Sequence, residues 1–227
     1  MTLKINYYIQ LQLLLIIVTI GTIKSSAQNN IREFKIPKTN SSATVSQTIA
    51  STQIEITYNR PNKRGREIFG SLIPYGEIWR TGADEATEIY FNTRITLQDL
   101  AIDSGRYELF TIPNKSSWEI ILQKNNNQWG SYRYNIENDV IRFSVVPQLL
   151  NTSLETFTIS IDQVTADGGI LNIAWDNIRV PIKLKIDLKS TVIPELENCY
   201  SAPKSPHIFM QPCSTMKTIL TLIVPRS

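Results

Sequence analysis

The residues best suited to chemistry lie in one segment, residues 58–87 (YNRPNKRGREIFGSLIPYGEIWRTGADEAT). Its arginines carry planar guanidinium groups that bind a carboxylate, sulfate or phosphate through two parallel hydrogen bonds. Its aromatic residues offer ring faces that are apolar and carry a polar tip. Further rings follow at Trp129, Tyr132 and Tyr134. These residue types predict a surface for a small anionic or sugar-like ligand, built from Arg60, Arg66, Tyr75, Trp79, Arg80, Glu85, Trp129 and Tyr132.

A structural interpretation of the same residues stays open. The arginines could pair with Glu67, Glu77, Asp84 or Glu85 and cap loop carbonyls, with the aromatic rings in the core. Glycines and prolines in the segment demand a defined backbone path, which suits a rigid loop under either interpretation.

Catalysis by carboxylates is the alternative function, as in a hydrolase that acts on glycans. Asp84 and Glu85 are adjacent, so on an extended strand they point to opposite faces. A glycosidase-like pair therefore needs a partner from elsewhere, such as Glu67, Glu77 or Asp139, and the spacing selects none of them. No catalytic residue and no cofactor is predicted.

Asp162 and Asp167 beside the Gly168-Gly169 pair could ligate calcium, but the pattern favours a plain hairpin. No metal site is therefore predicted. The one histidine, His207, and both cysteines, Cys199 and Cys213, lie near the end of the chain. A Ser-His-Asp site, a Cys-His site and a zinc site of histidine or cysteine are thus excluded from residues 43–188.

The chain begins with a leader-like segment. Lys4 precedes an apolar run from Leu11 to Ile20, and Ser25-Ser26-Ala27 offers small residues for cleavage after Ala27. Residues 1–27 are thus expected to be a secretory signal peptide, which places the protein in the periplasm or outside the cell. The alternative is a membrane anchor, for which the apolar run is short. No transmembrane segment is expected in the mature chain.

The rest of the sequence predicts a short lead-in over residues 28–42 and one all-β domain over residues 43–188. The domain shows short runs of β-branched and aromatic residues separated by turn residues. Asp167-Gly168 is the best hairpin signal, and Asp176-Asn177 is predicted as another tight turn. This spacing is typical of an antiparallel β-sandwich or barrel, here with a long loop insertion between the strand-like run that ends at Tyr58 and the run that begins at Glu88. The formal net charge of +3 is concentrated at the two ends, which argues against nucleic-acid binding.

The segment 58–87 resembles the signature of domain-of-unknown-function family 2911, a group of exported bacterial proteins mainly from Bacteroidota. The family pattern is approximately Y-x-R-P-x-x-x-G-R-x-I-F-G-x-L-V-P-Y-G-x-V-W-R-T-G-A-N-E-A-T. The chain departs from it at Ile73 and Ile78, which are mild apolar changes, and at Asp84, which stands where the family usually has Asn. The pieces GRYELFTIP (105–113) and NQWGSYRY (127–134) also resemble the family. The resemblance covers residues 43–188 and implies a fold and export, without an established activity.

The tail, residues 189–227, is expected to be short and irregular or partly helical, because it has scattered prolines and no apolar period. Relatives often continue into a helical extension, so a frameshift and a natural disordered tail are two open explanations. Taken together, the sequence predicts an exported, noncatalytic sandwich that binds a ligand or a cell-envelope protein, or has a purely structural role.

Overall fold

The computed structural model describes residues 39–124 and 129–188. The predicted signal peptide, most of the lead-in and the tail lie outside the described residues. The first strand begins at Ser41, two residues before the expected start of the domain. In the described part of the chain, no helix is long and apolar enough to cross a membrane.

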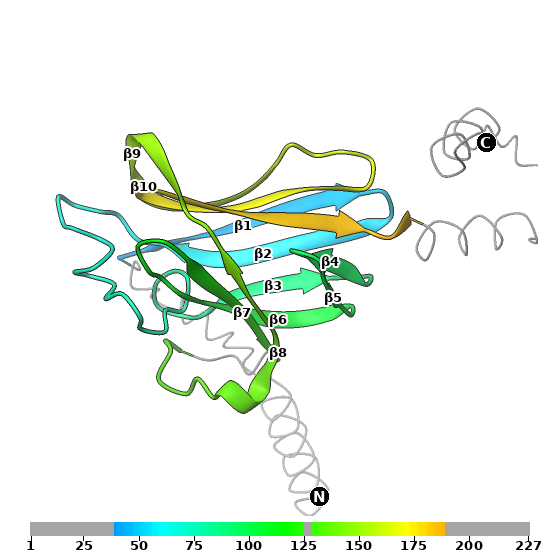
Figure 1. Cartoon of the computed structure of the whole chain (residues 1–227), viewed down its shortest axis with the longest axis horizontal. Coiled ribbons are helices and arrows are strands. Elements are labelled where there is room, and N and C mark those ends of the chain that lie inside the picture. The colour runs from blue at the N-terminus through cyan, green and yellow to red at the C-terminus, as the bar shows by residue number, and fades with distance from the viewer. Residues whose placement is uncertain (1–38, 125–128, 189–227) are drawn as a thin grey trace, which may run out of the picture. The chain divides into compact units, whose positions relative to one another are not determined.

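In the described residues, ten antiparallel strands form two sheets, which confirms the predicted all-β sandwich (Figure 1). The six-stranded sheet has the order β1-β2-β3-β6-β7-β8, and the four-stranded sheet has the order β5-β4-β10-β9. The 3₁₀ turn η1 (Ile136–Asn138) precedes β8. The strands are β1 (Ser41–Ile49), β2 (Thr52–Arg60), β3 (Thr87–Phe91), β4 (Ile95–Leu97), β5 (Leu100–Ile102), β6 (Gly105–Ile112), β7 (Trp118–Lys124), β8 (Asp139–Val145), β9 (Gln148–Asp162) and β10 (Gly168–Ile186).

Alternation along the strands decides which side chains face the core. In β2, Ile54, Ile56 and Tyr58 are buried while Gln53 and Thr57 are exposed. This period of two puts one face of each strand against the opposite sheet and leaves the other outside. The centre of the core is aromatic, and the contacts are mostly edge-to-face. It is built from Tyr58, Phe69, Trp79, Trp118, Phe157 and Trp175.

The predicted hairpin at Asp167-Gly168 is confirmed, because β9 and β10 pair antiparallel across it. The predicted turn at Asp176-Asn177 is wrong. The strand β10 continues through these residues, and its register with β9 shifts on both sides of Asp176, whose φ is 52°. The polar pair therefore marks a β-bulge instead of a chain reversal. The strands β4 and β5 were not predicted from the sequence, because each is only three residues long.

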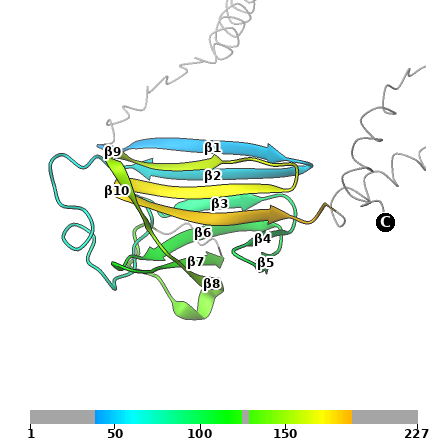
Figure 2. The same ribbon diagram turned by 45° about the horizontal axis from the view of Figure 1, so that its top comes forward.

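The loop insertion at residues 61–86 joins β2 to β3. Figure 2 shows it as a long excursion at one end of the sandwich. Its middle buries Ile68, Phe69 and Ile73, and the Ile73 N–H donates to the Ile68 carbonyl at 2.8 Å. Phe69 and Ile73 form an isolated bridge across this tight turn. The apolar middle anchors the loop to the core and so fixes the polar residues at its two ends.

Candidate functional site

The first part of the segment 58–87 runs along the edge of β9 that does not pair with β10. Lys63 N donates to the Glu155 carbonyl at 2.7 Å, and Phe157 N donates to the Pro61 carbonyl at 2.9 Å. Arg60 Nε donates to the Phe157 carbonyl at 3.0 Å, and Arg60 Nη2 donates to Thr158 Oγ1 at 2.9 Å. Arg60 therefore ties the two sheets together and covers hydrogen-bonding groups that β9 would otherwise present at its edge.

Trp79 lies in the core and closes the end of the sandwich. It exchanges two backbone hydrogen bonds with Thr111, at 2.8 and 2.9 Å, and its indole N–H donates to the Gly82 carbonyl at 3.0 Å. The ring is 8% exposed and packs parallel to Trp175, with centroids 6.1 Å apart. Trp79 is therefore a packing residue, as the structural interpretation of the segment has it.

Arg66 stays in the loop and caps two nearby carbonyls. Its Nε donates to Lys63 at 3.0 Å and its Nη2 to Asn62 at 2.7 Å. These contacts are exposed, so they hold the turn in shape and add little to stability.

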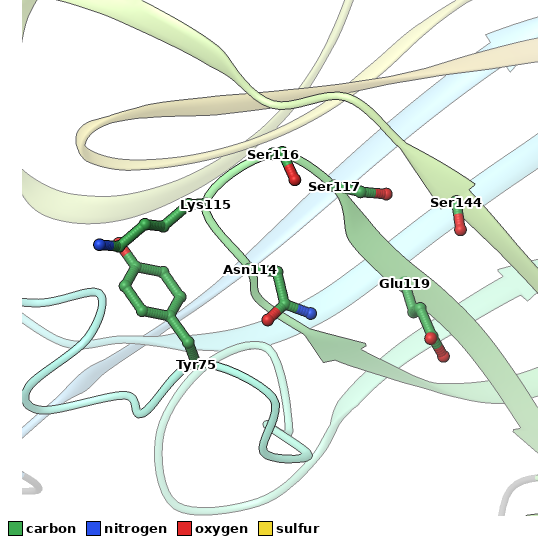
Figure 3. Close-up of a pocket in the computed structure, with 7 residues that line it drawn as sticks. All are labelled: Tyr75, Asn114, Lys115, Ser116, Ser117, Glu119 and Ser144. Atoms are coloured by element: carbon green, nitrogen blue, oxygen red, sulfur yellow. The ribbon is translucent and has the colours of Figure 1, made fainter.

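Tyr75 borders an open hollow of about 470 Å³ at the turn between β6 and β7. Figure 3 shows the Lys115 side chain beside the Tyr75 ring, where its Nζ lies 6.0 Å from the ring centroid. Asn114, Ser116, Ser117, Glu119 and Ser144 complete the lining. Tyr75 therefore lines this hollow, and its role differs from that of the aromatic residues further along the chain.

The remaining predicted residues come together on the outer side of the six-stranded sheet. Glu85 and Trp129 form an isolated antiparallel bridge, and Gly130 N donates to the Asp84 carbonyl at 3.0 Å. Asn59 Nδ2 donates to Glu85 Oε2 at 2.8 Å. The backbone of residues 84–85 therefore holds residues 129–130. This contact brings Trp129 and Tyr132 next to the loop.

Trp129 and Tyr132 form an exposed stack beside these contacts. Their ring centroids are 6.0 Å apart and the ring planes differ by 17°. Trp129 is 62% exposed and Tyr132 is 80% exposed. Large rings at this exposure are unusual for a folded domain and mark candidate contact surfaces. We call these two residues the aromatic stack.

Arg80 lies next to the aromatic stack. Its Nη1 is 3.6 Å from the position that a Cβ atom on Gly130 would occupy, and Tyr132 Cδ2 is 2.9 Å from the same position. Gly130, with φ of 76°, thus lets the guanidinium and the tyrosine ring approach the same point of the backbone. Arg80 Nε is buried and has no hydrogen-bond partner among the described residues. Such a donor normally carries a cost of about 1–3 kcal/mol.

Asp84 has a backbone role. Its φ is 58°, which is the left-handed region that Asn and Asp tolerate better than other residues with a side chain. Asn40 Nδ2 donates to its Oδ2 at 3.2 Å. This explains how aspartate can stand where asparagine is usual in the resembling proteins, because both residues suit this conformation.

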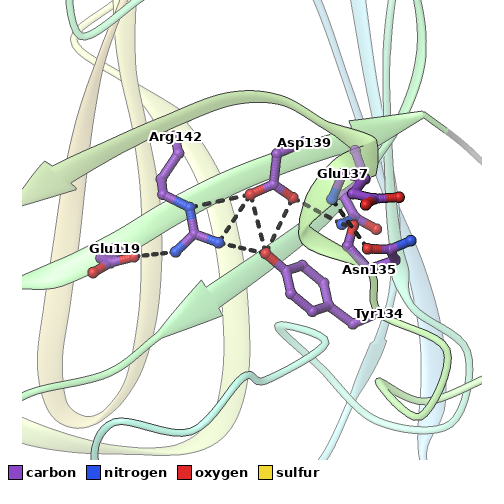
Figure 4. Close-up of polar contacts among 7 residues, drawn as sticks. Glu119, Tyr134, Asn135, Glu137, Asp139 and Arg142 are labelled. Atoms are coloured by element: carbon purple, nitrogen blue, oxygen red, sulfur yellow. Dashed lines mark hydrogen bonds and ion pairs between the residues drawn. The ribbon is translucent and has the colours of Figure 1, made fainter.

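A polar cluster fastens the segment behind the aromatic stack to β7 and β8 (Figure 4). Tyr134 Oη donates to Asp139 Oδ2 at 3.0 Å, and Arg142 contacts Tyr134, Asp139 and Glu119. Gln123 Nε2 donates to Asp139 Oδ1 at 2.8 Å. Burial, together with the bond to Asp139, raises the pKa of Tyr134 to about 12. The phenol therefore stays protonated at neutral pH and serves as a donor.

The structure thus brings together four of the eight predicted binding residues: Arg80, Glu85, Trp129 and Tyr132. It places Arg60 and Trp79 inside the fold and Arg66 and Tyr75 elsewhere on the loop. Arg142 and Gln123 of the polar cluster were missed, since each lies in an ordinary strand pattern. Within residues 39–124 and 129–188, no group of three or more His, Cys, Asp or Glu side chains is positioned to hold a metal ion.

Residues 40–184 match the profile of a family described as Protein of unknown function (DUF2911). The chain belongs to this family. The match covers all ten strands except the end of β10, together with the loop insertion and the aromatic stack. No curated protein and no solved structure is similar enough to the chain to be matched. Membership in DUF2911 therefore confirms the resemblance of the segment 58–87 and carries no activity with it.

Proposed function

We propose that this DUF2911 domain binds an acidic sugar on the surface formed by the aromatic stack and Arg80. The observation that carries the proposal is the buried Arg80 Nε, which has no partner among the described residues, in a side chain whose Nη1 approaches Gly130 close to the exposed Tyr132 ring. A cost of this kind is more readily retained where a ligand supplies the missing acceptor.

The chemistry of the surface favours a ring that carries a negative charge. The apolar face of a sugar ring packs on an aromatic side chain, and a carboxylate or sulfate on that ring accepts hydrogen bonds from a guanidinium. Glu85 is exposed next to the stack, and its carboxylate is already oriented by Asn59. It can accept hydrogen bonds from sugar hydroxyl groups.

The proposal includes a setting outside the cytoplasm. The leader-like residues 1–27 support it, because they have the charged, apolar and small-residue regions of a signal peptide. An exported protein meets acidic sugars in polysaccharides and in components of the cell envelope. The carboxylate-dependent hydrolase has less support, since Asp84 and Glu85 are held by Asn40 and Asn59 and Asp139 is engaged by Tyr134 and Arg142.

Calorimetric titration with oligogalacturonate and with an uncharged oligosaccharide of equal length tests the proposal. We expect the acidic sugar to bind and the uncharged one to bind more weakly. Trp129→Ala should weaken binding of both sugars, and Arg80→Met should abolish the difference between them. Leu149→Ala is the matched control, because Leu149 is 77% exposed on β9, away from the stack. Equal affinity for both sugars, or binding unchanged in both variants, would contradict the proposal.

Arg80→Met also separates binding from a structural role. Replacing a buried donor that has no partner by an apolar side chain of similar length is neutral or stabilising. We therefore expect the melting temperature of Arg80→Met to equal or exceed that of the wild type. A marked fall would mean that Arg80 supports the fold.

A further inference from the structure

We infer that the free edge of β1 pairs with β1 of a second copy of this chain, in an antiparallel arrangement about a twofold axis. The strand pairs with β2 over all nine residues, from Ser41 opposite Arg60 to Ile49 opposite Thr52, without a register shift. It is the terminal strand of its sheet, and among the described residues no strand pairs with its other side. Figure 2 shows β1 as the outermost strand of the sandwich.

The β1 edge lacks the features that usually prevent edge-to-edge pairing. Its sequence, SSATVSQTI, contains no charged residue, no proline and no glycine. Edge strands are normally protected by such residues, by bulges, by short length or by a covering segment. A regular strand of nine residues without them is a template for another strand.

The other three edges of the described sheets each have a protective feature. The strand β5 has three residues, and β8 carries Asp139 and Arg142 and breaks register with β7. The strand β9 is covered at Glu155 and Phe157 by the segment that follows β2, and at Ile159 by the Tyr58 hydroxyl of β2. The contrast singles out β1 within the part of the chain that the structure describes.

The hairpin between β1 and β2 decides which backbone groups are free. Ala50 and Ser51 form a two-residue turn, in which the Ile49 carbonyl accepts from Thr52 N. Hydrogen bonding alternates along an antiparallel strand, so Ser42, Thr44, Ser46 and Thr48 direct their N–H and C=O groups away from β2. These four residues can form about eight hydrogen bonds to a second strand.

A second copy fits this edge because the strand is complementary to itself. A twofold axis at Val45 places Thr44 opposite Ser46 and Ser42 opposite Thr48 of the other copy. All four hydroxyl side chains are exposed on the outer face, and no like charges meet. Val45 and Ala43 already pack against the core from the inner face, and Val45 would meet its own counterpart across the axis. The contact is isologous and closes as a dimer.

Sedimentation equilibrium of the purified full chain, together with two double variants, tests this inference. The wild type should show a dimer whose population rises with concentration. T44K/S46K places lysine opposite lysine twice and should weaken the dimer about tenfold or more. T44K/S46E places each lysine opposite a glutamate of the other copy and should restore it, which is specific to a twofold axis at Val45.

The matched control is T57K, which removes the same contact between Thr44 Oγ1 and Thr57 Oγ1 but lies one strand inside the edge. It should leave the dimer unchanged, and circular dichroism should show all variants folded. A monomer mass for the wild type across its soluble range would overturn the inference. So would a T44K/S46E variant as weak as T44K/S46K. Sugar binding at the aromatic stack is independent of either outcome.

Discussion

Tyr58 in one sheet and Ile159 in the other are joined by two hydrogen bonds through a single hydroxyl group. Ile159 N donates to Tyr58 Oη at 3.0 Å, and Tyr58 Oη donates to the Ile159 carbonyl at 3.3 Å. The tyrosine is 3% exposed and packs edge-on against Phe157, with centroids 5.7 Å apart. Tyr58, the first residue of the family signature, thus gives hydrogen-bond partners to both the N–H and the carbonyl of Ile159, which is buried at the edge of β9.

Tyr58→Phe should therefore destabilise the fold although it removes one oxygen atom. The change leaves a buried N–H and a buried carbonyl without their partner, which costs about 1–3 kcal/mol. Chemical denaturation measures this as a fall in the free energy of unfolding. Tyr90→Phe is the control, because Tyr90 lies on the outer face of β3 beneath the Arg106 guanidinium. Equal stabilities of the two variants would contradict the role assigned to Tyr58.

Arg60 and Arg66 should differ in their contribution to stability although both belong to the signature. Arg60→Met removes donors to the Phe157 carbonyl and to Thr158, across the two sheets. Hydrogen bonds from a charged donor contribute about 1.5–3 kcal/mol. Arg66→Met removes only exposed contacts to Asn62 and Lys63, and a change within about 0.5 kcal/mol is expected. Thermal denaturation of the two variants side by side measures this difference. An Arg66→Met variant less stable than Arg60→Met would contradict the roles assigned to the two arginines.

The sequence predicted most of the fold because hydrophobic alternation is a local signal. Strands such as β2 and β6 have clear periods and turn residues at their ends. The bulge at Asp176 was mistaken for a turn because its partners are distant in sequence. Lys63 Nζ lies 2.5 Å from Asp176 Oδ1, and Ser153 Oγ donates to the same oxygen at 2.7 Å. A polar residue inside a long strand is tolerated there only because these side chains reach it.

The sequence predicted the residue types of the candidate site, but not which of those residues lie in it. Arginine and aromatic residues in one loop suggested a single surface, yet Arg60 and Trp79 point into the fold. Adjacent residues alternate between core and outside, so Trp79 and Arg80 go in opposite directions. The position of Trp129 depends on its backbone bridge to Glu85, a long-range pairing that no local spacing reports.

The pair of Lys63 and Asp176 should make stability depend on pH in the acid range. Burial alone would raise the pKa of Asp176, but hydrogen bonds from Lys63 and Ser153 outweigh it and leave the pKa below its usual value. The stabilisation is therefore complete above the unfolded-chain value of about 4, and it is lost as the pH falls through the lower folded value.

Denaturation curves recorded between neutral and strongly acid pH measure this effect. The wild type should lose stability more steeply below about pH 4 than Asp176→Asn, which has no carboxylate to protonate. Asp103→Asn is the control, because the Asp103 side chain is 83% exposed and lies 3.5 Å from an exposed Arg94. Its pH dependence should follow the wild type. If Asp176→Asn also followed the wild type, the pair would have no part in acid stability.

Gly130 should be required for the aromatic stack and much less for the fold. Gly130→Ala and Gly65→Ala both put a side chain at positive φ, 76° and 71°, which costs about 1–2 kcal/mol in each case. Only at Gly130 does the new Cβ meet other atoms, since it lies 2.9 Å from Tyr132 Cδ2 and Cε2, whereas Gly65 has nothing within 4 Å. Because Tyr132 is exposed, its ring can move aside at little further cost. The two variants should therefore have similar stabilities, while nuclear Overhauser contacts between the Trp129 and Tyr132 rings disappear in Gly130→Ala alone. Contacts that persist in both variants would show that the stack does not depend on the close approach at Gly130.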